Sequence, residues 1–123
     1  MNIYVKINDN VYPASITGRI NDKDWNNRSS KAIRLEMPYA EAANLFVDDI
    51  DWAIVQEFEE TIENYDEEGN VIHETVTRTE EYDNSEYNIA GPITDHRDGT
   101  VTVKMGKPTA EELLEMIIQG VLA

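Results

Sequence analysis

Residues 95–99 read DHRDG, and a histidine flanked by two carboxylates has the chemistry to bind a divalent metal or to move a proton. However, five consecutive side chains around a tight turn do not converge on one point. Asp-Gly is also an ordinary pair for the tip of a β-hairpin, because glycine takes the positive φ that such a turn requires. The stretch therefore predicts a turn, and we assign it no catalytic role.

Other polar clusters also lack the arrangement that chemistry requires. Asp48, Asp49 and Asp51 offer oxygens to Ca²⁺, but no twelve-residue EF-hand loop surrounds them, and DEEGN at 66–70 lacks the ligand spacing of such a loop. His73 has no second histidine nearby. The sequence contains no cysteine, which removes thiolate nucleophiles, disulfides and Cys-based zinc sites. We therefore expect no catalytic residue, no metal ligand, no cofactor and no enzymatic activity.

Acidic residues dominate the charge of the chain. Among 123 residues, 25 Asp and Glu stand against 10 Lys and Arg, which gives a formal net charge of −15 and a pI near 4.3. Phosphate backbones and anionic membranes repel such a protein, so we expect no direct nucleic-acid binding and no membrane attachment. Basic proteins, divalent cations and further copies of the chain remain as partners. Solubility through a charged surface is the simplest explanation.

The ends of the chain carry no targeting pattern. The first residues, MNIYVKIND, alternate polar and apolar side chains and lack the basic start and the continuous apolar run of a signal peptide. The apolar cluster at 113–122 is interrupted by Glu115, Gln119 and Gly120, and it is too short to span a bilayer. We therefore expect a protein that stays in the cytoplasm.

Alternation of polar and apolar residues predicts β-strands along most of the chain. The expected elements are an N-terminal hairpin over 2–8 and 11–16, a strand over 32–37, a short helix over 39–46, a later hairpin over 87–94 and 100–105, and a C-terminal helix. Residues 17–30 read as a polar connection that carries one large apolar side chain, Trp25.

The most unusual segment is a pair of long strands between 50 and 82. Apolar residues recur at alternate positions over 50–62, β-branched residues recur over 71–82, and DEEGN supplies the turn. A strand of about 13 residues exceeds the usual length and reaches roughly 40 Å. Acids dominate residues 57–81, which we call the arm. Because a free two-stranded ribbon is only marginally stable, the arm needs either a packed face or a partner.

Together these elements predict an α+β fold of one domain over residues 1–123. It consists mostly of antiparallel β-hairpins, with the arm protruding as a long β-ribbon and one short helix after the third predicted strand. The C-terminal helix begins with Thr109 as N-cap, and Glu112 completes a capping box. Its apolar residues are expected to pack on the sheet. These are Leu113, Leu114, Met116, Ile117, Ile118 and Val121.

Five side chains are candidates for contacts with other proteins: Trp25, Phe58, Ile62, Tyr65 and Val76. Trp25 lies in a polar connection, so its ring either folds back onto the core, which is the simpler expectation, or docks a neighbour. The other four lie on the arm, whose edges leave backbone groups unpaired. A symmetric pairing buries the base of each arm against the other copy. We therefore expect a homo-oligomer, most simply a dimer, with the acidic tip free for a basic partner.

Several stretches together resemble small uncharacterised proteins of phages and prophages of Gram-positive (Firmicutes) bacteria. The stretches are DKDWNNRSSKAIRLEM, YAEAANLFVDDIDWAI, EEGNV and EYDNSEYNIAGPITDHRDGTVTVKMGKPT, followed by the final helix. Genes for such proteins lie in the tail or baseplate region. The resemblance runs along most of the chain but contains no biochemical motif. It implies a phage context and carries over no catalytic residue.

These observations favour a non-enzymatic phage or prophage protein with a virion-accessory or tail-assembly role. It would act through protein–protein contacts, with other phage structural proteins among its partners, in the host cytoplasm or in the virion. The alternative is an acidic inhibitor that imitates DNA and occupies a host nucleic-acid-binding protein, because carboxylates along a rigid ribbon present charge as a phosphate backbone does. A carboxylate-based metal enzyme is the third and weakest hypothesis.

Overall fold

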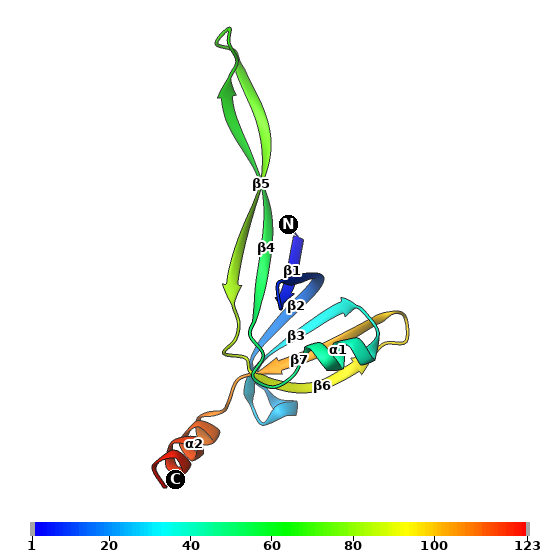
Figure 1. Ribbon diagram of the computed structural model, residues 1–123, viewed down its shortest axis with the longest axis vertical. Helices are drawn as coiled ribbons and strands as arrows, with labels where there is room; N and C mark the ends of the chain where they lie inside the picture. Colours follow the sequence, from blue (N-terminus) through cyan, green and yellow to red (C-terminus); the bar gives the residue numbers. More distant parts are fainter. Residues whose placement is uncertain (1, 123) are drawn as a thin grey trace.

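The computed structural model describes residues 2–122, and the side chains of residues 2–120. The fold is mostly an antiparallel sheet of seven strands in the order β5-β4-β1-β2-β3-β7-β6, with two α-helices (Figure 1). The strands are β1 (Asn2–Ile7), β2 (Asn10–Asp22), β3 (Arg28–Glu36), β4 (Trp52–Tyr65), β5 (Val71–Asp83), β6 (Ile89–Asp95) and β7 (Thr100–Gly106). The helices are α1 (Tyr39–Leu45) and α2 (Ala110–Leu122), and a 3₁₀ turn, η1, spans Lys23–Trp25.

The segment predicted as a polar connection, 17–30, is largely strand. β2 continues to Asp22 and β3 already begins at Arg28, with Thr17 paired to Ala32 and Arg19 to Ser30. These strand ends are not visible in the sequence because their residues are mostly polar: those of β2 at 17–21 are exposed, and those of β3 include the buried polar residues Arg28 and Ser30. Pairing with a neighbouring strand overrides the weak local preference. Only η1 and a left-handed pair of asparagines, 26 and 27, remain as the turn.

The core lies between the sheet and α1. Its buried apolar side chains come from β1, β3, β7, α1, the residues just after β3 and α1, and the first residue of β4. They are Val5, Ile7, Ile33, Leu35, Met37, Ala42, Phe46, Trp52, Val101, Val103 and Met105. α1 contacts β6 and β7 and supplies Ala42. Trp52 is 2 % exposed, and its indole N–H donates to the carbonyl of Tyr87 at 3.0 Å. The base of the arm is therefore anchored in the core.

The two strands of the arm extend beyond the edge of the rest of the sheet. β1 pairs with β4 only as far as the Asn2–Glu57 pair, whereas β4 and β5 stay paired up to Tyr65 and Val71 at the turn. Figure 1 shows the two strands extending together well past the end of β1. Beyond residue 57 this part of the sheet is two strands wide.

The expectation that the C-terminal helix packs on the sheet is not met. The capping box is present, since Glu112 accepts from the Thr109 N–H at 2.8 Å and the Glu112 N–H donates to the Thr109 hydroxyl at 3.2 Å. The apolar side chains of α2 are nevertheless exposed, and Figure 1 shows the helix leading away from the sheet. An ion pair in its first turn, described below, fixes this direction. Val121, part of the predicted apolar face, lies outside the described side chains.

Candidate interaction surface

The arm is a continuous antiparallel ladder with open edges. Thirteen residue pairs join β4 to β5 without a register shift, from Ala53–Asp83 to Tyr65–Val71. β5 is an edge strand of the sheet along its whole length, and β4 has no second neighbour beyond Glu57 among the described residues. Backbone N–H and C=O groups on both edges are thus free to pair with another strand.

The register divides the arm into two faces, because side chains alternate along a strand. Even-numbered residues share the face that continues from Trp52 and the core. This even face carries an apolar series along both strands: Ile54, Phe58, Ile62, Ile72 and Val76. Phe58 and Val76 are half-buried, whereas Ile62 and Ile72 are exposed.

Charges on the even face are largely paired. Arg78 lies opposite Phe58, with its guanidinium 5.7 Å from the ring centroid. The same guanidinium contacts Glu60 and Glu80 at 3.2 Å each. Glu74 accepts a hydrogen bond of 2.8 Å from the amide of Asn64. One arginine therefore stands against three carboxylates on this face, Glu60, Glu74 and Glu80, so the even face combines an apolar series with a smaller negative charge than the other face.

The odd-numbered residues form a different, acidic face. Glu57, Glu59 and Glu63 alternate on β4, and they stand opposite Thr79, Thr77 and His73 on β5. Near the base β1 supplies partners, since Asn2 donates to Glu57 at 3.1 Å and Lys6 pairs with Glu81 at 2.8 Å. Among the described residues no ion pair reaches Glu59 or Glu63. This odd face is therefore the more acidic side of the arm.

The tip is organised by one carboxylate. Asp66 accepts from the backbone N–H groups of Glu68 at 2.9 Å and Asn70 at 2.8 Å, and its own N–H donates to the carbonyl of Asn70 at 3.0 Å. Gly69 takes a φ of +84°, which the turn requires. The hydrogen bond from the Asn70 N–H is the main reason that the pKa of Asp66 lies below its usual range.

We expect Asp66→Ala to speed amide exchange at Glu68 and Asn70 and to leave Val101 and Val103 unchanged. The lowered pKa means that the carboxylate acceptor is present above the unfolded pKa, near 4, and is lost as the pH falls through the folded value. Hydrogen exchange between pH 5 and 7 measures the effect (a window set by that pKa).

Asp66→Asn is the control that keeps the size and shape of the side chain and removes its charge. It keeps one amide oxygen as acceptor and should lie between the wild type and Asp66→Ala. Salt should also slow exchange in the arm by screening its acids. Exchange at the tip as slow as at Val101 in both the wild type and Asp66→Ala would contradict the prediction.

Of the five predicted contact residues, four lie on the arm and one does not. Phe58, Ile62 and Val76 share the even face, whereas Tyr65 lies on the odd face and is 71 % exposed. Trp25 is half-buried in η1, far along the sheet from the arm. Its ring closely approaches Gly91 and Gly106 and stacks under the Arg28 guanidinium, which is 4.9 Å from the ring centroid. The structure thus folds Trp25 back onto its own sheet.

The residues that resemble a catalytic or metal site have structural hydrogen-bond partners within the fold. Asp95 and Asp98 each accept from the N–H two residues ahead, at 2.9 Å, and His96 Nε2 lies 2.7 Å from the Thr102 hydroxyl. Asp48 accepts from the Ala90 N–H at 2.8 Å. Across the described residues, no group of three or more His, Asp or Glu side chains is placed to hold a metal ion. An open groove of about 870 Å³ beside β1–β3 is lined by mixed polar and apolar groups.

Sequence reasoning missed a buried polar cluster beside Trp25. Asp22 is fully buried and accepts from Ser30 at 3.0 Å and from the Lys104 ammonium at 2.9 Å. These hydrogen bonds, that of Lys104 first, lower the pKa of Asp22. Arg28 is also buried and forms a bidentate ion pair with Glu112, with N–O distances of 2.7 and 3.1 Å. The partners are distant in sequence, so no local signal connects them.

Comparison of the chain with protein-family models, with curated proteins and with solved structures finds no match. Among the described residues no helix is long and apolar enough to cross a membrane.

Proposed function

We propose that the protein is a non-enzymatic assembly protein that acts through contacts made by its arm. The observation that carries the proposal is the division of the arm into an apolar even face, continuous with the core, and an acidic odd face, with open strand edges on both sides. A monomer with no use for this surface would gain nothing from holding Phe58, Ile62 and Val76 away from its core.

The two faces of the arm would have different roles in binding a partner. The even face supplies the apolar contact, and the free edge of β5 supplies backbone hydrogen bonds, as in the addition of a strand to a sheet. The acids of the odd face and the tip disfavour acidic partners and speed encounter with basic ones. The partner is therefore a protein with an apolar groove or strand edge bordered by Lys and Arg.

The resemblance to proteins of the tail and baseplate gene region indicates where the proposed assembly role would take place. We propose that the chain works in the host cytoplasm during assembly of phage tails, and that its partners are other phage structural proteins. Incorporation into the virion is part of the same proposal. No nucleic acid or membrane is involved in it.

The DNA-mimic inhibitor remains a second candidate, because the odd face presents Glu57, Glu59 and Glu63 in alternating positions without a basic side chain between them on β4. The two candidates rely on opposite faces of the arm. Assembly needs the apolar even face, whereas DNA mimicry needs only the carboxylates.

A matched pair of variants separates the two functions. Ile62→Thr with Val76→Thr removes apolar side chains from the even face, and Thr61→Val with Thr75→Val changes the odd face; both pairs keep β-branched residues and the net charge. In an inducible prophage that carries the gene, we expect the even-face pair to block formation of complete tails, and the odd-face pair to leave it intact. Electron microscopy of the lysate and plaque titre measure the outcome.

Normal tails from the even-face pair would overturn the proposed function. In that case, competition with duplex DNA for a host DNA-binding protein would test the second candidate. Folding of each variant is checked by circular dichroism, so that a loss of tails is not confused with loss of the domain.

A further inference from the structure

α2 is oriented with its polar side toward its own domain. Glu112, Glu115, Met116 and Gln119 line an open groove of about 370 Å³, whose other wall comes from the loops at 48–49 and 88–89. Residues at this spacing form one face of a helix. The side that faces this groove therefore carries two carboxylates, an amide and one apolar side chain, Met116, and is mostly polar, whereas an ordinary surface helix turns its apolar side inward.

The outward side of α2 is apolar. Its stripe consists of Leu113, Leu114, Ile117 and Ile118, with exposed fractions of 47, 58, 64 and 48 %. Among the described residues no other element covers this stripe. A helix of 13 residues is marginal in water without tertiary packing, so the stripe requires a cover.

The first turn of α2 is fixed to the sheet. Arg28 contacts both carboxylate oxygens of Glu112 and donates to the carbonyl of Lys107 at 3.0 Å. The hydrogen bond from Arg28 is the main reason that the pKa of Glu112 falls to about 2, so the pair stays ionised near neutral pH. The Arg28 guanidinium also stacks on the Trp25 ring, which helps to fix its position. The outward direction of the stripe is thus built into the fold.

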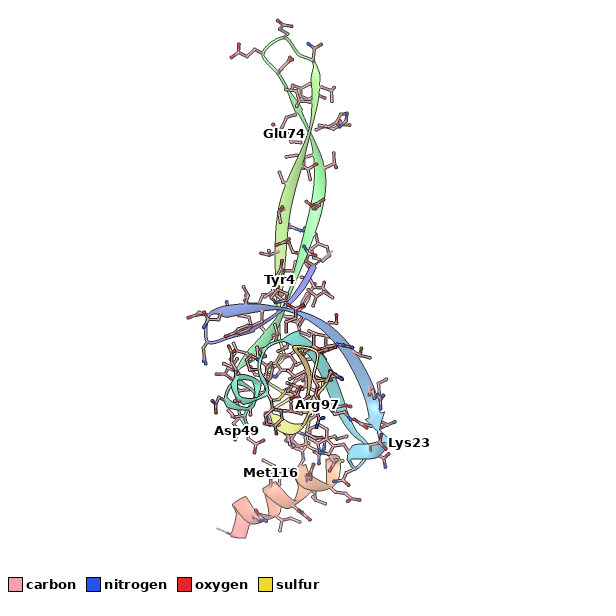
Figure 2. All side chains as sticks on the ribbon, turned by 90° about the vertical axis from the view of Figure 1, so that its right-hand side faces the viewer. Tyr4, Lys23, Asp49, Glu74, Arg97 and Met116 are labelled. Carbon is pink, nitrogen blue, oxygen red and sulfur yellow. The ribbon has the colours of Figure 1, made fainter. Side chains whose placement is uncertain are left out.

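We propose that the apolar stripe of α2 binds the same stripe of a second copy of this chain. Glu112 and Glu115 lie on the opposite side of α2, and Glu111 borders the stripe only in the first turn, so the stripes can meet beyond that turn without opposing carboxylates. Figure 2 shows Met116 and Glu74 near opposite ends of the molecule. A contact through α2 therefore keeps the two acidic arms far apart, well beyond the screening length of about 8 Å at physiological salt. Pairing through the arms would instead bring their acids together.

The size of the stripe sets the strength of the contact. Four large side chains that are half exposed offer an apolar patch of a few hundred Å² per copy, the scale at which exposed patches mark interaction sites. A standard stable interface buries about 800 Å² per partner. The dimer should therefore be reversible, forming at roughly 100 µM and dissociating near 1 µM.

Analytical ultracentrifugation of the full chain tests the proposal. We expect dimers that dissociate on dilution. Leu114→Glu and Ile117→Glu, both at exposed positions, should each weaken association by at least about tenfold, because each places an unpaired carboxylate in the contact. Gln119→Glu adds the same charge to the polar side of α2 and should leave association unchanged.

A further variant separates this proposal from the proposed function. Replacing 59–79 by an Asn-Gly turn removes most of the arm but leaves α2 intact, and this variant should still dimerise. A wild type that is monomeric at the higher concentration would overturn the proposal, as would dimerisation that survives Leu114→Glu or is lost with the arm. None of these outcomes bears on whether the arm is needed for tails.

Discussion

Trp52→Ala should lower the free energy of unfolding by about 3–5 kcal/mol, the usual cost of truncating a buried aromatic side chain. Trp52 is almost fully buried at the base of β4 and meets Tyr87 edge-on at 6.5 Å between ring centroids. The substitution also removes the indole donor from the Tyr87 carbonyl. Since domains of this size are stable by only about 5–15 kcal/mol, urea denaturation should show a large fall in the transition midpoint.

The control lies ten residues along the same strand and on the same face. Ile62→Thr should change the free energy of unfolding by less than about 0.5 kcal/mol, because its side chain is exposed on the arm. Trp52→Phe should be intermediate, since it keeps most of the apolar volume and loses the donor. Similar losses for Trp52→Ala and Ile62→Thr would mean that the arm is packed as tightly as the core.

The contrast between these two positions shows how the sheet is used. One alternating pattern runs along β4, yet its first apolar residues, Trp52 and Ile54, contact the core, whereas Ile62 near the tip is exposed. Evolution of a stable monomer would favour polar side chains at Phe58 and Ile62. Their presence on a solvated ribbon is the basis of the proposed partner binding.

The strands of the arm could be predicted from sequence because their signals are local. Alternation, β-branched residues and a turn with Gly69 placed both strands within a few residues of their observed ends. The sequence did not predict which residues of β4 share a face with which residues of β5, because this match depends on the pairing of the two strands. The pairing register places Val76 of β5 on the same face as Phe58 and Ile62, whereas alternation along β4 by itself puts Tyr65 on the other face.

The orientation of α2 could not be predicted, because it depends on residues far away. An apolar stripe on a capped helix is typical of packing against the same domain. Here Arg28, 84 residues before Glu112, turns the acidic side inward. For the same reason Asp22 and Lys104, 82 residues apart, gave no sequence signal. The polar residues of 17–30, whether exposed like Asn21 or buried like Ser30, likewise gave no sign of the two strand ends, which pairing determines.

Gly106→Ala should also lower the free energy of unfolding, because the added methyl group meets the Trp25 ring. A Cβ at Gly106 would lie 2.7 Å from Arg28 Cδ and 2.8–3.0 Å from the Trp25 ring, so both side chains must shift. Overpacking of this kind costs about 1–3 kcal/mol. Gly18→Ala is the matched control within the sheet, because no atom lies within 4 Å of the added Cβ. That substitution should be neutral within about 0.5 kcal/mol.

A double-mutant cycle then decides what Trp25 does. Trp25→Ala alone should destabilise the domain, since the ring packs on Gly91 and Gly106. It also opens the space that the new methyl group needs. Gly106→Ala combined with Trp25→Ala should therefore cost at least about 1 kcal/mol less than the sum of the single substitutions, as coupled neighbours do. Additive losses in urea denaturation would mean that the ring does not rest on Gly106 in solution. Trp25 would then regain its place among the residues available to a partner, and the stacking that supports the Arg28–Glu112 pair would be lost with it.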